Sequence, residues 1–141
     1  MYLLKKTFNG KRVIVTGHTG FKGSWLSLWL KSLGAKVMGI SSEIPTKPSH
    51  FELMGMKNFV ITKKLNIQDL NSLTLTIKKF KPDFIFHLAA QAIVKESYSD
   101  PLKTWKTNVF GSMNLLESLK NLKTKKKLVV IMITSDKAYK N

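Results

Sequence analysis

The sequence predicts an α/β fold in which a doubly wound, parallel sheet of about five strands, in the order 3-2-1-4-5, has helices on both faces. Short apolar runs rich in β-branched residues alternate with longer runs whose apolar residues recur at helical spacing. The short runs are continuously apolar, which indicates strands buried on both faces and therefore a parallel sheet. Right-handed crossovers between such strands give the doubly wound order.

The first strand and the helix after it have the clearest pattern. Residues 12–17, RVIVTG, place Val13, Ile14 and Val15 in a row shortly before a glycine, as in a buried strand. A helix follows from Phe21, and Gly34 closes it as a C-terminal cap. Its apolar positions include Trp25 and Trp29, which we expect on the buried face.

The second and third strands are separated by a loop. Residues 35–40, AKVMGI, predict the second strand. The next sixteen residues, 41–56, contain two prolines, so we expect a loop with one helical turn near residues 51–54. A third short strand is expected near residues 59–61, and Asp69 then begins a helix.

The last part of the chain contains two more strands. Residues 82–90, PDFIFHLAA, predict the fourth strand, and a long helix follows from about Asp100, with Trp105 on its apolar face. Residues 126–135, KKLVVIMITS, predict the fifth strand, which is the most hydrophobic of all. The length of 141 residues suits one domain, residues 1–141.

Composition excludes several classes of protein. The chain has no cysteine, and its three scattered histidines form no cluster, so we expect neither disulfides nor a metal site. The net charge is +16, but the cations include a single arginine, Arg12, which argues against a nucleic-acid partner. No apolar run approaches the roughly 20 residues of a membrane span, and the first residues do not form a secretory signal. We therefore expect a cytoplasmic protein without nucleic-acid or membrane partners.

Three regularly spaced glycines lie between the first strand and its helix. Gly17 permits a tight turn, Gly20 permits backbone to approach a pyrophosphate, and Gly23 permits close packing of helix and strand. The unpaired amides of the first helical turn point at a bound anion, and Lys22 adds a positive charge. Because such sheets bind ligands beyond the carboxyl ends of their strands, the glycines predict a nucleotide site.

The spacing G-x-x-G-x-x-G resembles that of the short-chain dehydrogenase/reductase superfamily, in its extended branch that acts on nucleotide sugars. DFIFHLAAQAIVKESYSDP resembles the fourth-strand motif of that branch, with Ala89 and Ala90 in its alanine pair. TNVFGSMNLLES resembles its central helix, with Asn108 at the characteristic asparagine. Ser135, four residues before Tyr139, fits its catalytic serine or threonine. The resemblance implies a Rossmann-type domain that binds NAD or NADP.

Four stretches together, TGHTGFKGSWLSLWL, SSEIPTKPSHFEL, HLAAQAIV and TSDKAYKN, resemble the family of CDP-glucose 4,6-dehydratases. Such enzymes oxidise the sugar at C4 with bound NAD, eliminate water across C5 and C6, and return the hydride to C6. The resemblance implies CDP-glucose as the substrate and Ser135 as the partner of the C4 oxygen. Asp136 and Lys137 would serve the elimination as proton donor and base, and the sequence leaves open which residue has which role.

The resemblance also implies a set of binding residues. The expected cofactor-binding residues are Gly17, His18, Thr19, Gly20, Phe21, Lys22, Gly23, Ser41, Ser42, Asn66, Ile67, Leu88, Ala89, Ala90, Asn108 and Thr134. Gln91 and Ser97 match regions that contact the sugar. No acidic residue directly ends the second strand, and Glu43 is a late candidate to hold the ribose 2′-hydroxyl, so NAD is preferred and NADP stays open.

The catalytic Y-x-x-x-K motif of this branch normally lies beyond the last residue of the chain, and AYKN is not that motif. We therefore expect an amino-terminal portion of a dehydratase, inactive by itself, whose full-length form is a homodimer or larger homo-oligomer. Two alternatives remain: a nucleotide-sugar epimerase or other extended short-chain dehydrogenase, and a non-catalytic NAD(P)-binding module.

Overall fold

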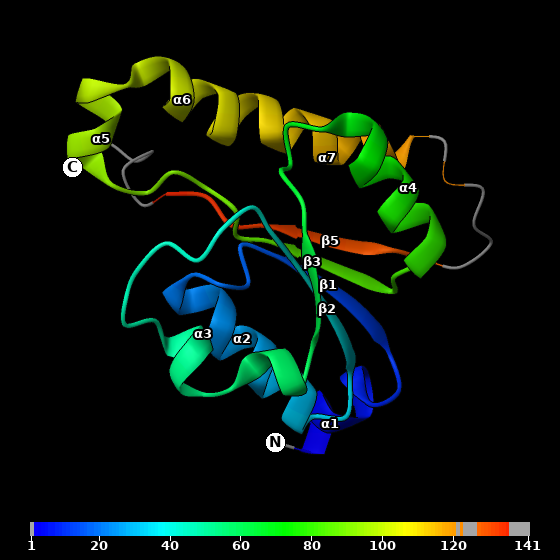
Figure 1. Ribbon diagram of the computed structural model, residues 1–141. Helices are drawn as coiled ribbons and strands as arrows, with labels where there is room; N and C mark the ends of the chain where they lie inside the picture. Colours follow the sequence, from blue (N-terminus) through cyan, green and yellow to red (C-terminus); the bar gives the residue numbers. More distant parts are fainter. Residues whose placement is uncertain (1, 121, 123–126, 136–141) are drawn as a thin grey trace.

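A computed structural model of the chain describes residues 2–120, 122 and 127–135. Its described residues form one parallel sheet of five strands in the order β3-β2-β1-β4-β5 (Figure 1). The strands are β1 (Arg12–Thr16), β2 (Lys36–Ser41), β3 (Ile61–Lys64), β4 (Phe84–His87) and β5 (Val129–Met132). The predicted fold class and strand order are confirmed.

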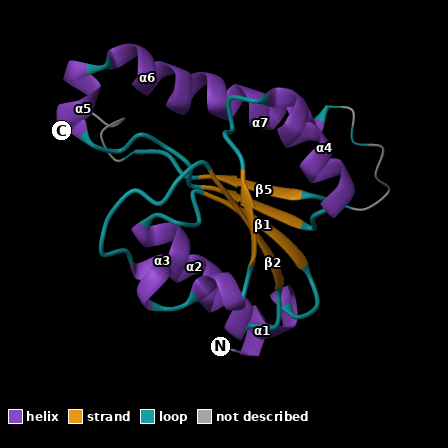
Figure 2. Ribbon diagram, in the orientation of Figure 1, coloured by secondary structure: helices purple, strands orange, loops and turns teal. Residues whose placement is uncertain are grey.

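Helices cover both faces of the sheet (Figure 2). On one face lie α1 (Tyr2–Phe8), α2 (Phe21–Ser32) and α3 (His50–Leu53), with the short 3₁₀ helix η1 (Met56–Asn58). On the other face lie α4 (Leu70–Phe80) and α7 (Gly111–Leu119). α5 (Val94–Ser99), α6 (Pro101–Trp105) and the π-helical segment η2 (Lys106–Phe110) lead from β4 into α7. The long helix predicted from about Asp100 is therefore three consecutive segments, while α1 and α5 were not predicted.

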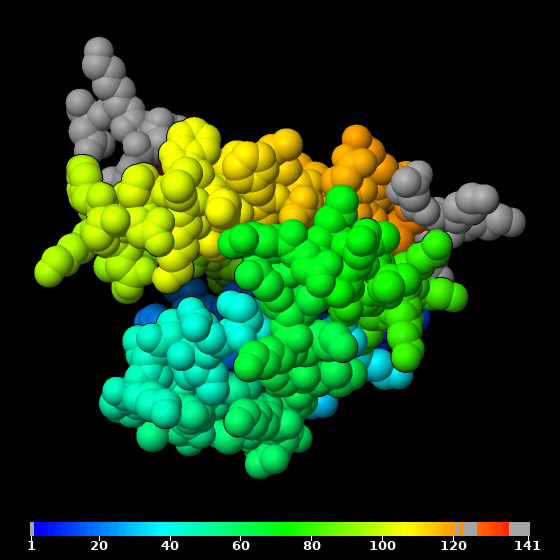
Figure 3. Space-filling model, turned by 45° about the horizontal axis from the view of Figure 1, so that its top comes forward, coloured from blue at the N-terminus to red at the C-terminus, as the bar shows by residue number. Residues whose placement is uncertain are grey.

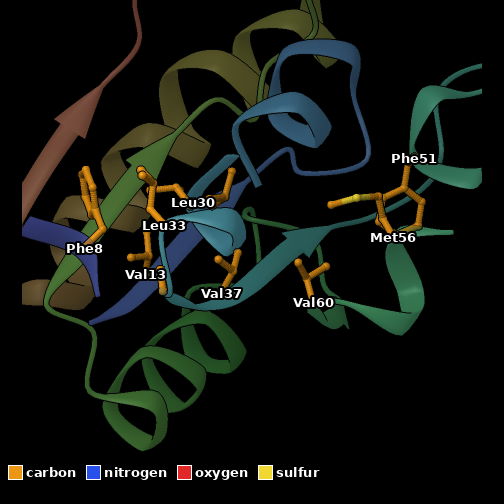
Figure 4. Close-up of a cluster of buried hydrophobic side chains, with 10 residues drawn as sticks. Phe8, Val13, Leu30, Leu33, Val37, Phe51, Met56 and Val60 are labelled. Atoms are coloured by element: carbon orange, nitrogen blue, oxygen red, sulfur yellow. The ribbon is translucent and has the colours of Figure 1, made fainter. Parts of the chain in front are cut away.

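Alternating residues of β1 supply the two hydrophobic cores. Val13 and Val15 face α2 and α3, in a cluster that also contains Leu30 and Phe51 (Figure 4). Ile14 faces the opposite side, in a cluster with side chains of α4 and α7 that include Leu73, Ile77 and Leu115. β1 is thus buried on both faces, as its unbroken apolar sequence predicted.

The third strand begins two residues later than predicted, at Ile61. Phe59 and Val60 instead end the turn of η1, and both of their amide groups donate to the carbonyl of Met56. The four side chains of β3 are exposed, because β3 is an edge strand. Of the three residues predicted as this strand, only Val60 is buried, and it belongs to the turn before β3.

The two tryptophans of α2 do not lie on its buried face, so that prediction was wrong. Trp25 and Trp29 are 49% and 47% exposed. The buried positions of α2 are Gly23, Ser24, Ser27 and Leu30. Three of these four residues are small, which lets the helix approach the sheet closely and directs its large side chains outward.

None of the helices in the described part of the chain has both the length and the apolar character that crossing a bilayer requires.

A side-chain cap at Ser49 begins α3, and its removal should destabilise the chain measurably. Ser49 Oγ accepts the Glu52 amide at 3.2 Å and donates to the Glu52 carboxylate at 2.9 Å. We expect Ser49→Ala to lower the free energy of unfolding by about 1 kcal/mol. Ser32→Ala, which removes an exposed hydroxyl at the last residue of α2, is the control. Equal urea-unfolding midpoints for the two variants would contradict the role of the cap.

Candidate nucleotide-binding site

The candidate site lies where the order of the strands reverses. β1 pairs with β2 on one side and with β4 on the other, and Thr16 is in register with both Ile40 and His87. The three strands therefore end together, and the loops that follow β2 and β4 diverge on either side of Gly17. In open α/β sheets this is the crevice in which ligands bind.

The turn after β1 requires glycine at two positions. Gly17 has a φ of +71°, and a Cβ there would lie 2.8 Å from the backbone nitrogen of Ala89. At Gly23 a Cβ would collide with the carbonyl oxygen of Gly17. The turn at Gly17 is therefore in direct backbone contact with the start of α2 and with the loop after β4. The glycine spacing predicted the close approach at Gly23 and did not predict the contact of Gly17 with the loop.

The amino end of α2 faces this crevice without a side-chain cap. Its N-cap residue is Gly20, and the first turn contains no acidic residue. The side chains of Phe21 and Lys22 are exposed. A Cβ at Gly20 would contact only the carbonyl oxygen of Gly17, at 3.3 Å, so space is left over the helix end. Uncapped amides and the positive end of the helix dipole suit a phosphate group.

His18 lies beneath the glycine turn with no exposed surface. Its Nδ1 lies 2.9 Å from Ser41 Oγ, and its Nε2 lies 3.3 Å from Thr62 Oγ1. Burial lowers the pKa of His18 to about 4, although the Ile40 carbonyl acts in the opposite direction. The neutral imidazole thus joins the turn to Ser41 at the end of β2 and to Thr62 within β3, so any contact with a phosphate falls to the backbone of His18.

The carboxyl end of β2 is closed by two further hydrogen bonds. Ser41 Oγ lies 2.8 Å from the Ile40 carbonyl and 2.9 Å from His18 Nδ1. Thr19 Oγ1 donates to the carbonyl of Glu43 at 2.6 Å. The side chains of Ser42 and Glu43 are exposed at this end of the strand. The sequence suggests Glu43 as the residue that holds the ribose 2′-hydroxyl of the cofactor.

On the other side of the turn, polar groups connect β1, β4 and the long helix. His87, which is 3% exposed, lies 2.8 Å from Thr16 Oγ1 through Nδ1 and 2.9 Å from Ser112 Oγ through Nε2. Burial lowers the pKa of His87 to about 4. Asn108 lies in η2, and its amide group bonds to both the N–H and the C=O of Gln91.

In the space-filling view, atoms of the N-terminal, blue part of the chain are recessed between the cyan segment that follows β2 and the yellow segment of α5 and α6 (Figure 3).

A sequence model of the GDP-mannose 4,6 dehydratase family matches residues 14–140, a range that includes all of the candidate site described above. The chain belongs to that family.

Several relatives of the chain act on nucleotide sugars. It is 47% identical, over 137 residues, to CDP-glucose 4,6-dehydratase of Salmonella typhimurium, and the match covers 97% of this chain and 38% of that enzyme. It is 31% identical to UDP-glucose 4-epimerase of Mycoplasma genitalium, over 83% of this chain and 34% of the epimerase. The chain thus spans little more than a third of the length of these relatives.

Solved structures show the same fold. A UDP-glucose 4-epimerase from Stenotrophomonas maltophila superposes with a TM-score of 0.78 at 24% identity, over 90% of this chain and 38% of that one. The UDP-glucose 4-epimerase of Brucella ovis, in complex with NAD, gives a TM-score of 0.72 at 28% identity, over 87% of this chain and 35% of that one.

In this member of the GDP-mannose 4,6 dehydratase family, several residues that were predicted to bind a ligand form hydrogen bonds with the backbone of neighbouring residues. Gln91 binds the backbone N–H and C=O of Ile93 with its own amide group. Ser97 donates to the carbonyl of Val94, and Asn66 Oδ1 accepts the Gln68 amide. Contacts of Gln91, Ser97 and Asn66 with a ligand therefore stay predictions.

The predicted catalytic residues lie at the end of the described chain. Thr134 and Ser135 are exposed and lie two and three residues beyond the end of β5, and the Ile133 amide donates to the His87 carbonyl at 3.0 Å. Ser135 thus follows the segment that runs beside the end of β4. Asp136 and Lys137 lie outside the described residues.

Sequence reasoning missed Thr16 and Ser112, the two hydroxyl groups that bind His87. A polar residue at the end of an otherwise apolar strand was the available signal for Thr16. Ser112 offered none, because its partnership depends on how the long helix packs against β4. His87 is buried, and both of its ring nitrogens have hydrogen-bond partners.

Proposed function

We propose that residues 1–141 form the cofactor-binding domain of a nucleotide-sugar 4,6-dehydratase that binds NAD at the turn after β1. The observation that carries the proposal is the uncapped amino end of α2 at Gly20, next to a turn whose glycines bring three backbone segments into contact. The NAD-bound epimerase of Brucella ovis, with the same fold, supports this choice of cofactor.

The chain's own residues would bind NAD in two halves. The first-turn amides of α2 and Lys22 would hold the pyrophosphate. Ser42, Glu43, Asn66 and Ile67 would hold the adenosine half beyond β2 and β3, and Leu88, Ala89, Ala90, Asn108 and Thr134 would line the other half. The exposed carboxylate of Glu43 would disfavour the extra phosphate of NADP. Bound NAD supplies the hydride acceptor and donor that this chemistry requires.

The substrate we propose is CDP-glucose, because the Salmonella typhimurium relative at 47% identity is a CDP-glucose 4,6-dehydratase. Ser135 would donate a hydrogen bond to the C4 oxygen of the sugar. Of Asp136 and Lys137, one would take the proton from C5 and the other would give a proton to the departing C6 hydroxyl. Gln91 and Ser97 would lie at the sugar.

We also propose a cytoplasmic enzyme that assembles as a homodimer or larger homo-oligomer. The long helix supports self-association, since Trp105, Phe110, Met113 and Leu116 are each at least half exposed.

Calorimetric titration tests the cofactor site. We expect the chain to bind NAD, and NADP more weakly. Gly20→Asp should weaken NAD binding about tenfold or more, because its carboxylate would cap the amides that hold phosphate and repel the phosphate charge. Gly20→Ala is the matched control, since it adds a Cβ without a charge and should bind NAD more tightly than the aspartate variant. Equal NAD affinity of both variants would contradict a phosphate site at this helix end.

A chimera tests the reaction. The 141 residues would replace the matching part of the Salmonella typhimurium enzyme, to which they are 47% identical. With CDP-glucose we expect a product lighter by one water in mass spectrometry, and none from the same chimera carrying Ser135→Ala. A folded, NAD-binding chimera that leaves CDP-glucose unchanged would contradict the dehydratase assignment.

A further inference from the structure

We propose that His87 is a positioning residue. It holds the loop after β4 where this loop would contact the half of the dinucleotide distant from adenosine. This inference rests on the proposed function, because it assumes that NAD occupies the site. His87 is buried and would act on the ligand only through this loop. The inference follows from a chain of hydrogen bonds whose donors and acceptors can be determined one by one.

Thr16 determines which nitrogen of His87 is protonated. Thr16 Oγ1 accepts the amide of Ala89 at 3.1 Å, and it shares the amide of Leu88, at 3.2 Å, with the Thr16 carbonyl. A hydroxyl oxygen has two lone pairs, and both are used by these amides. The hydroxyl hydrogen is therefore left for His87 Nδ1, at 2.8 Å, which accepts it. His87 must be the tautomer that has its hydrogen on Nε2.

The chain of hydrogen bonds continues from Nε2 to the long helix. His87 Nε2 donates to Ser112 Oγ at 2.9 Å, and Ser112 Oγ donates to the Asn108 carbonyl at 2.7 Å. The Asn108 side chain returns to the loop, where it accepts the Gln91 amide at 2.8 Å and donates to the Gln91 carbonyl at 3.0 Å. Residues 88–91 are thus fixed at both ends by one network with His87 at its centre.

The position of this loop matters because it forms one wall of the site. Gly17 lies so close to Leu88 and Ala89 that a Cβ would be within 2.9 Å of backbone atoms of both residues. The loop belongs to the β4 side of the switch point, whereas His18, Ser41 and Thr62 hold the β2 side. A dinucleotide bound across β1 has its adenosine half over β2, so the β4 loop meets the other half.

His87 does not fit a direct role in chemistry. It is 3% exposed, and both ring nitrogens are occupied by hydroxyl groups of the protein. The neutral ring accepts a hydrogen bond at Nδ1 from Thr16 in β1 and donates one at Nε2 to Ser112 in α7. It thereby joins β1 to α7. A change at His87 should therefore act through the loop.

The experiment compares two ligands that share the adenosine half. Calorimetric titration with NAD and with ADP would be carried out on the wild-type chain, His87→Leu and His87→Asn. We expect His87→Leu to weaken NAD about tenfold and ADP less than about twofold, since it breaks both hydrogen bonds of the ring. His87→Asn, whose Oδ1 can replace the Nδ1 acceptor for Thr16, should recover part of the NAD affinity.

Other outcomes overturn the inference. Equal losses for NAD and ADP would indicate a merely structural residue, and unchanged NAD affinity in folded His87→Leu would exclude any positioning. If His87→Leu does not fold, Ser112→Ala breaks the same chain without altering the ring, and NAD affinity equal to that of the wild type would refute the proposal. A wild-type chain that binds neither ligand would refute the proposed function instead.

Discussion

Lowering the pH from 7 to 4 is expected to reduce the free energy of unfolding by roughly 2–3 kcal/mol for each of two buried histidines. Burial lowers the pKa values of His18 and His87 from 6.5 to about 4. Between these pH values the unfolded chain binds protons that the folded chain excludes. The stabilisation is therefore complete above pH 6.5 and is lost as the pH falls through 4. Because small domains have a total stability of about 5–15 kcal/mol, this loss brings the chain close to unfolding.

Urea unfolding followed by tryptophan fluorescence at pH 7, 5.5 and 4 measures this loss. His87→Asn should reduce the dependence on pH by about half, because one of the two contributing groups is removed. His50→Asn is the matched control, since it also removes a histidine but leaves His18 and His87 in place. A free energy of unfolding that stays constant from pH 7 to pH 5 in the wild type would contradict the burial of neutral rings.

Gly23→Ala is expected to lower the free energy of unfolding by about 3 kcal/mol or more and to weaken NAD binding over tenfold. The added methyl group would collide with the Gly17 carbonyl oxygen and would lie 2.8–2.9 Å from the Gly17 carbonyl carbon and His18 Cα. These are backbone atoms, so the methyl group can be accommodated only if the turn opens. Opening the turn moves α2 away from Gly17 and would distort the proposed phosphate site.

Gly20→Ala provides the comparison for stability, because a Cβ at Gly20 would meet a single atom at 3.3 Å. We expect the urea-unfolding midpoint of Gly20→Ala to stay near that of the wild type and that of Gly23→Ala to fall clearly below it. Similar midpoints for the two variants would mean that α2 can move away from the turn at little cost in free energy.

The strand–turn–helix unit could be predicted from sequence because each part has a local cause. Val13, Ile14 and Val15 favour a strand buried on both faces, and Gly17 is required where φ is positive. Strand order followed from the handedness of crossovers. The candidate site could be placed for the same reason, since the glycines that mark it are neighbours in the sequence.

The support of the site could not be predicted, because it joins residues distant in sequence. Thr16 and His87 are 71 positions apart, and His18 and Thr62 are 44 positions apart. Their contacts depend on strand register and on the packing of the long helix. The outward placement of Trp25 and Trp29 was missed for a related reason, since serines and a glycine decided which face of α2 approaches the sheet. Hydrophobicity alone gave the opposite result.

The buried, neutral character of the two histidine networks has a consequence for the energetics of recognition. Both walls of the crevice are held by hydrogen bonds internal to the protein, so the proposed NAD site would have its binding shape before the ligand arrives. Little conformational entropy is then lost when a ligand binds, and more of the interaction free energy is expressed as affinity. Association should follow a single kinetic phase whose rate rises linearly with ligand concentration, without a slower step of loop rearrangement.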